Sequence, residues 1–192
     1  MHSSGALVPS VSIESIRESV TMTSFKIVPL AAQVVRDIRM KRQDGYGNSQ
    51  LEPALAKPRS PCRACLTDAA PGERLLLFSY SPFHAPRPYR TMGPVFIHEQ
   101  PCEPSFDIEA VKTLVRSRLL VLRGYDVEDN LVEGVVTPGS DFESVAETLF
   151  EQSAIQRLHA FNAKAGCFLF EVNRTQPDPT GPLAPEARLH NK

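Results

Sequence analysis

The sequence predicts a single α+β domain, mainly an antiparallel sheet with two or three helices and long proline-rich loops. Short apolar runs typical of strands outnumber the amphipathic stretches typical of helices. Most of these runs are joined by turns too short for a crossover helix, which favours antiparallel pairing. Ten of the 17 prolines fall between Pro53 and Pro104. Because proline lacks a backbone N–H, this region should be rich in turns.

The first folded elements are expected soon after the N-terminus. Phe25–Pro29 is predicted to be a short strand and Leu30–Lys41 an amphipathic helix. The apolar face of this helix would hold Val34, Val35 and Ile38. Its charged face would hold Arg36, Asp37 and Arg39.

A loop over Asp44–Pro61 and a tight turn over Cys62–Asp68 are expected next. A second turn, Ala70–Glu73, leads into a strand at Arg74–Tyr80. The apolar run of that strand predicts burial on both faces. Another strand is expected at Pro94–His98.

The second half of the chain continues with a predicted helix at Phe106–Val115. Two strands follow, Arg118–Tyr125 and Leu131–Thr137, joined by a turn at Asp126–Asn130. This spacing predicts a hairpin.

The last elements are a helix and two closing strands. Asp141 is expected to cap a helix that runs to about Gln152. Ile155–Ala160 and Cys167–Val172 are predicted strands around a turn at 162–166.

The composition of the two ends differs from that of the middle. Residues 1–23 are expected to be a flexible extension, 24–174 the single domain and 175–192 a disordered tail with several prolines. We expect the natural start of the protein at or close to Met22, with Met1 as the alternative that stays open.

The charge balance excludes some partners. With 21 basic and 22 acidic residues, the net charge is −1, so neither nucleic acid nor an anionic membrane is expected as a partner. No apolar run approaches the roughly 20 residues that a membrane-spanning helix needs. No convincing secretory signal is present, and we expect a cytoplasmic protein.

Three cysteines and one histidine have spacings typical of a zinc site. Cys62 and Cys65 form a Cys-x-x-Cys pair, and His98 precedes Cys102 by four positions. Three thiols and one imidazole can surround a tetrahedral zinc ion. If all four bind, the site is closed and structural, because no position remains for water. The predicted cofactor is therefore a structural zinc ion, and no catalytic residue is assigned.

Other interpretations of these residues remain open. They can be separate buried thiols and a surface histidine. Cys62 and Cys65 can instead form a redox dithiol or supply a cysteine nucleophile, with His84, His98 or His159 as the base. The two function hypotheses are thus a small binding or interaction domain and an enzyme of unknown class.

Six arginines offer a weaker hypothesis, an anion site: Arg63, Arg74, Arg87, Arg90, Arg118 and Arg123. The guanidinium group binds carboxylate or phosphate through two parallel hydrogen bonds, although salt bridges and solvated strand ends are the simpler explanation. The best-placed contributors are Arg123–Asp126, at a strand end, and Asn162 with Lys164, in a turn.

Several motifs together resemble a family of mostly bacterial proteins catalogued as domain of unknown function 1203. They are Pro61–Glu73, Tyr89, Gly93–His98, Cys102–Glu103, Arg118, Arg123–Asp126 and Asn162–Cys167. The resemblance covers about Phe25 to Arg174. It implies one integral domain and no particular activity, substrate or cofactor.

Overall fold

The computed structural model describes residues 25–83 and 85–175. The extension expected over 1–23, and all of the expected tail except Thr175, lie outside these residues. The described part contains eight strands, three α-helices and one 3-10 helix, which confirms the α+β class. In chain order they are β1 (Phe25–Val28), α1 (Ala32–Lys41), β2 (Ala54–Leu55), β3 (Arg74–Tyr80), β4 (Gly93–His98), α2 (Ile108–Val115), β5 (Leu119–Tyr125), β6 (Leu131–Pro138), the 3-10 helix η1 (Gly139–Asp141), α3 (Phe142–Phe150), β7 (Arg157–Asn162) and β8 (Phe168–Arg174).

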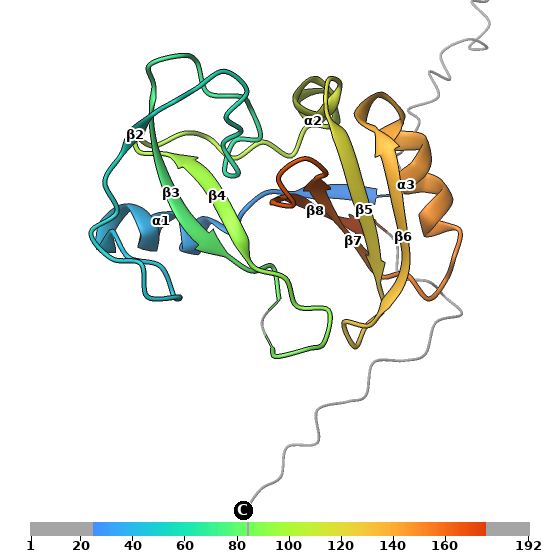
Figure 1. Ribbon diagram of the computed structural model, residues 1–192. Helices are drawn as coiled ribbons and strands as arrows, with labels where there is room; N and C mark the ends of the chain where they lie inside the picture. The colour runs from blue at the N-terminus through green and yellow to red at the C-terminus, as the bar shows by residue number, and fades with distance from the viewer. Residues whose placement is uncertain (1–24, 84, 176–192) are drawn as a thin grey trace, which may run out of the picture.

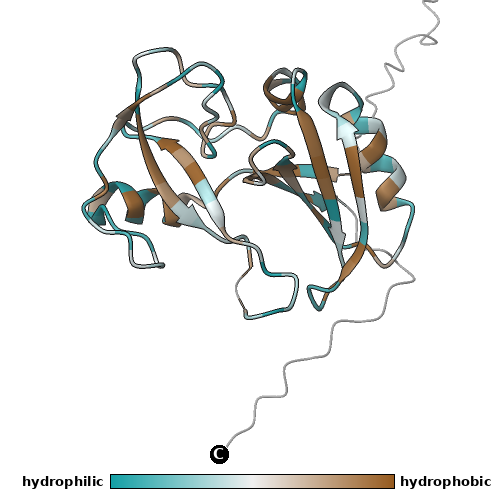
Figure 2. Cartoon of the chain, in the orientation of Figure 1, coloured by the Kyte–Doolittle hydropathy of each residue, from teal (hydrophilic) through white to brown (hydrophobic). Residues whose placement is uncertain are grey.

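The strands form two antiparallel sheets that lie side by side (Figure 1). The larger has the order β1-β8-β7-β5-β6, and the smaller has the order β2-β3-β4. The expected hairpin is present as β5 and β6, and β7 pairs with both β5 and β8. Apolar residues are concentrated on the strands, and polar residues on the loops (Figure 2).

Two hydrophobic cores lie on opposite faces of the larger sheet. Helices α2 and α3 cover one face and bury residues such as Val111, Phe142 and Phe170. On the other face, Phe161 and Phe168 pack with side chains from α1, β3 and β4. The Cys62 region belongs to this second core, so the candidate site lies on the side of the smaller sheet.

Several element boundaries differ from the predicted ones for local reasons. Helix α1 begins at Ala32 because the preceding residue, Ala31, is still extended, with a ψ of 132°. The N–H of Leu30 donates to the carbonyl of Arg63 at 2.9 Å. Helix α2 begins at Ile108 because the Asp107 side chain caps it, accepting from the N–H of Glu109. Asp141 precedes α3 as expected, but its side chain makes no capping hydrogen bond.

Strand β3 corrects the expectation of burial on both faces. Leu76 and Phe78 point into the second core, and Leu75 is covered by Ala56 and Ala69. Leu77, on the same face as Leu75, is 43% exposed because that cover ends before it.

No helix in the described ranges is long and apolar enough to span a membrane.

Candidate metal centre

A tight turn presents the first two cysteines. The N–H of Leu66 donates to the carbonyl of Cys62 at 3.0 Å, and the N–H of Cys62 donates to the carbonyl of Thr67 at 2.9 Å. Leu66 has a φ of 55°, in the left-handed region, and this reverses the chain. Its side chain is fully buried, which anchors the turn against the first core.

Backbone pairing then joins this turn to β4. Cys62 forms an isolated parallel bridge with Phe96, whose carbonyl accepts from the N–H of Arg63 at 2.9 Å. Because His98 is the last residue of β4, its position follows from this pairing. Pro101 lies in the loop after β4, and Cys102 follows it.

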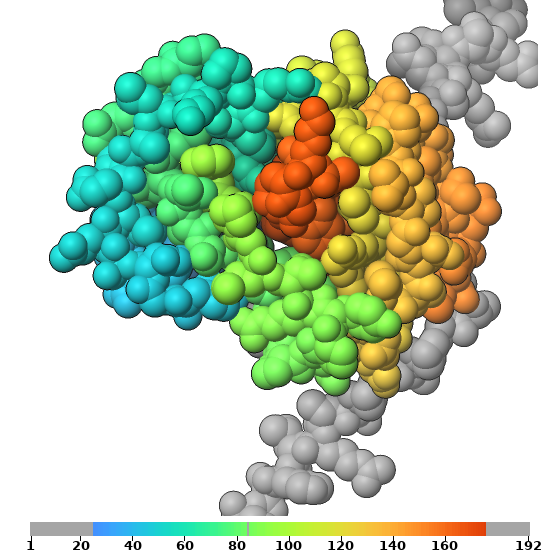
Figure 3. Space-filling view, in the orientation of Figure 1, coloured from blue at the N-terminus to red at the C-terminus, as the bar shows by residue number. Residues whose placement is uncertain are grey.

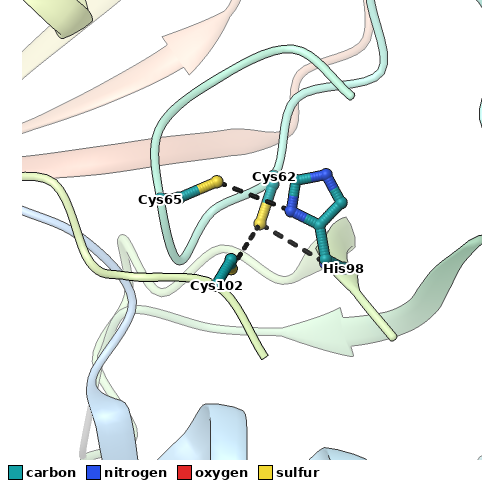
Figure 4. A group of neighbouring side chains, drawn as sticks. All are labelled: Cys62, Cys65, His98 and Cys102. Carbon is teal, nitrogen blue, oxygen red and sulfur yellow. Dashed lines mark hydrogen bonds between the residues drawn. The ribbon is translucent and has the colours of Figure 1, made fainter. Parts of the chain in front are cut away.

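The four predicted ligands converge in the structure (Figure 4). The Sγ atoms of Cys62 and Cys102 are 3.8 Å apart, and Sγ of Cys65 is 3.5 Å from Nδ1 of His98. All four candidate ligand atoms lie within 4.8 Å of one another. Segments up to 40 residues apart therefore meet at one point.

These separations suit a tetrahedral ion of the size of zinc. With Zn–S bonds of about 2.3 Å and a Zn–N bond of about 2.0–2.1 Å, the ligands of a regular tetrahedron are about 3.8 Å apart for two sulfurs and about 3.5 Å for sulfur and nitrogen. The Cys62–Cys102 and Cys65–His98 distances match these values. The remaining pairs exceed these values by at most about 1 Å for two sulfurs and about 1.3 Å for sulfur and nitrogen, since all lie within 4.8 Å.

Burial separates the four ligands into an inner and an outer pair. Cys62 is fully buried and Cys65 is 8% exposed. His98 and Cys102 are partly buried and form the side nearer to solvent.

Without a metal, the three thiols influence one another's protonation. Hydrogen bonds with Cys102 and then with Cys62 hold the pKa of the Cys65 thiol well below its usual value. The Cys102 pKa is raised well above its usual value, chiefly by Cys62 and Cys65. Cys102 lowers the pKa of Cys62, but Cys65 and burial leave it raised. Cys65 is therefore the thiol that loses its proton at the lowest pH. A metal that binds all three sulfurs would release the protons of Cys62 and Cys102.

Glu73 holds the far side of the histidine ring. Its Oε2 lies 3.2 Å from Nε2 of His98 and also accepts from the N–H of Ala70 at 2.7 Å. Ligating histidines usually donate their second ring N–H to such a carboxylate, which fixes the tautomer. Nδ1, which faces Cys65, is thereby left with its lone pair for a metal.

Arg39 supports the cluster from helix α1. Its Nη2 donates to Sγ of Cys102 at 3.3 Å, and its Nε donates to the carbonyl of His98 at 3.0 Å. From the sequence, Arg39 was expected on the charged, solvent-facing side of the helix. This expectation was wrong, because the side chain is half-buried against the cluster. A zinc ion bound by three thiolates and a neutral imidazole would carry one negative charge, which the guanidinium would balance.

Neither supporting residue was recognised as functional from the sequence. Glu73 was visible as the end of a turn and of the Pro61–Glu73 family motif, and nothing in the spacing linked it to His98. Arg39 and Cys102 are 63 residues apart, and only the packing of α1 on the smaller sheet brings them together.

A known protein family matches the part of the chain that contains the cluster. The family model "Protein of unknown function (DUF1203)" matches residues 59–174, more than half of the chain and all four cluster residues. The chain belongs to the DUF1203 family. No curated protein and no solved structure matches it.

The DUF1203 segment begins after α1 and β1, so it is narrower than the expected span from Phe25. Arg39 therefore supports the cluster from outside the matched segment. The DUF1203 segment contains Cys167, which lies apart from the cluster and accepts a hydrogen bond from Arg63 Nη2 at 3.1 Å. Arg63 is 1% exposed and also donates to the carbonyls of Pro61 and Phe168.

The other predicted sites in this DUF1203 protein are mostly structural. Arg74 pairs with Glu99, and Arg118 pairs with Asp68. The side chain of Asn162 accepts from the N–H of Lys164 and closes the β7–β8 turn. Of the alternative bases, His159 lies in the larger sheet, and His84 is outside the described residues.

Proposed function

We propose that Cys62, Cys65, His98 and Cys102 bind one structural zinc ion, and that the domain is a non-catalytic binding or interaction module. The observation that supports this most strongly is the approach of all four ligand atoms to within 4.8 Å of one another. Three sulfurs and one nitrogen in a tetrahedral arrangement are typical of zinc rather than of harder cations.

The position of the cluster supports a structural role. Four protein ligands leave no open coordination site for water or substrate. The ion would tie the Cys62–Thr67 turn, the end of β4 and, through Arg39, helix α1 to one another. Thiolate ligands persist in a reducing compartment, and we place the protein in the cytoplasm.

Dithiol chemistry is the competing function, because Cys62 and Cys102 lie 3.8 Å apart and the pKa of Cys65 is lowered. Full burial of Cys62 weighs against it, since a nucleophilic thiol must reach its substrate. The two functions differ in an observable way: zinc protects the thiols from alkylation, whereas a redox dithiol reacts.

Zinc titration of single cysteine variants tests the proposal. We expect Cys65→Ser and Cys102→Ser to lose most of their zinc affinity, because each lacks one thiolate. Cys167→Ser is the matched control, and it should still bind one equivalent, since Cys167 hydrogen-bonds to Arg63 instead. Equal binding by all three variants would overturn the proposal, as would alkylation of Cys65 at the same rate with and without zinc.

A further inference from the structure

A polar row crosses the inner face of the larger sheet, away from the cysteine cluster. Arg123 on β5 stands opposite His159 on β7, which stands opposite Glu171 on β8. Nε2 of His159 lies 3.2 Å from Oε2 of Glu171, whose other oxygen accepts from Nδ2 of Asn173 at 2.9 Å. The carboxylate thus holds the ring proton on Nε2 and leaves a lone pair on Nδ1.

Two buried polar atoms beside this row have no partner. Nδ1 of His159 and the hydroxyl of Tyr125 make no hydrogen bond with any described residue, and the two ring centroids are 4.8 Å apart. A buried polar atom without a hydrogen-bond partner is destabilising. Burial lowers the pKa of His159 and raises that of Tyr125. A neutral acceptor and a protonated donor therefore lie next to each other.

Arg123 supplies a positive charge at the same place. No carboxylate of the described residues lies within salt-bridge distance of it, whereas Arg157, on the neighbouring strand, pairs with Asp129. Its guanidinium lies 5.0 Å from the ring centroid of Phe161. It is also near the Tyr125 hydroxyl, without a hydrogen bond of acceptable geometry.

Phe83 covers one side of the rings of Tyr125 and His159. The ring of Phe83 packs edge-on against Tyr125 and His159, with centroids 5.1 and 5.0 Å away. Arg123 and Glu171 are only partly buried and reach solvent. In the space-filling view, the β7–β8 turn lies between the smaller sheet and the β5–β6 hairpin (Figure 3).

We propose that Arg123, Tyr125 and His159, with Glu171 as a positioning residue, bind a small molecule that carries an oxyanion next to a hydroxyl group. The guanidinium suits a carboxylate or a phosphate. The hydroxyl would donate to Nδ1 of His159 and accept from Tyr125, which satisfies both unpartnered atoms.

Matched small molecules test this site on the full chain loaded with zinc. Lactate carries both groups, propionate lacks the hydroxyl, and 1,2-propanediol lacks the carboxylate. We expect lactate to bind at least about tenfold more tightly than either of the others, as followed by the imidazole NMR signals of His159. Glycerol 3-phosphate and glycerol form the equivalent phosphate pair and identify the preferred oxyanion.

Variants complete the test. Arg123→Gln should remove the preference for lactate over 1,2-propanediol, and Arg116→Gln, on the exposed end of α2, should keep it. Failure of lactate and of glycerol 3-phosphate to shift the His159 signals, or equal affinity for lactate and propionate, would overturn the proposal. The zinc content of Arg123→Gln should equal that of the wild type, so this result is independent of the metal site.

Discussion

Oε2 of Glu73 lies 3.2 Å from Nε2 of His98, on the opposite side of the ring from the nitrogen that faces the thiols. The contact joins the turn before β3 to the end of β4, two neighbouring strands of the smaller sheet. It fixes both the orientation of the ring and the nitrogen available to a metal.

Replacing this carboxylate should weaken metal binding without removing a ligand. We expect Glu73→Gln to lower zinc affinity by about 10–100-fold, because the amide keeps the shape but loses the charge that makes the imidazole a stronger donor. Competition with a chromophoric chelator measures this. Glu133→Gln, at an exposed position on β6, should be unchanged. Equal affinities for Glu73→Gln and the wild type would show that Glu73 does not support the ligand.

We expect Arg39 to stabilise bound zinc through its positive charge and its two hydrogen bonds. We expect Arg39→Met to weaken zinc binding by about tenfold or more, because an uncompensated negative charge is then left beside Cys102. Arg39→Lys should lose less, since it keeps the charge. Arg36→Met is the control, because that exposed side chain donates to Gln33 on the same helix instead of to the cluster. An Arg39→Met protein that retains zinc as well as Arg36→Met would contradict this role.

Gly139 allows a close approach between η1 and the end of α2. A Cβ atom there would lie 1.9 Å from the carbonyl oxygen of Val115, which is backbone and cannot move aside. Gly139→Ala should therefore lower the free energy of unfolding by at least about 3 kcal/mol. Gly134→Ala, where a Cβ meets nothing within 4 Å, should change it by no more than about 0.5 kcal/mol. Denaturant unfolding of both variants checks this, and similar values for the two would refute it.

The burial of His159 predicts a pH dependence. Burial lowers the pKa of the ring, Arg157 and Arg123 act in the same direction, and Glu171 opposes them. The unfolded chain, with a pKa near 6.5, then binds more protons than the folded chain. The contribution of His159 to stability is thus complete above pH 6.5 and falls as the pH drops below that value.

An NMR titration of the ring measures this shift directly. The His159 signals should titrate below pH 6.5, and His159→Gln should lose less stability than the wild type between pH 6.5 and 5. Titration of His159 above pH 6.5 would show that Glu171, rather than burial, dominates its environment.

Local sequence patterns predicted those elements whose own residues form a clear apolar run or a recognisable turn. The apolar run of β3 and the hairpin of β5 and β6 are present at nearly the expected positions. Strand β2 was missed because it has only two residues, Ala54 and Leu55, whose extended shape depends on pairing with β3. The exposure of Leu77 also depends on tertiary cover, which alternation along one strand does not reveal.

The residues of the candidate site also fall into two groups, those that local sequence patterns identify and those that only tertiary packing brings together. Cysteine and histidine spacing identified the four residues that converge, because metal ligands follow short, recognisable intervals. Glu73 and Arg39 reach the cluster through strand pairing and helix packing, so no spacing rule contains them. The row of Arg123, His159 and Glu171 requires the strand register, which is set only when β5, β7 and β8 pair.

The most direct test of the central claim is the metal content of the purified full chain, combined with its thermal unfolding with and without a strong chelator. The account predicts one zinc ion per chain, and a loss of at least about 3 kcal/mol on chelation, which corresponds to about 6–12 °C in Tm. A metal-free protein that binds no added zinc and unfolds at the same temperature with the chelator would contradict it.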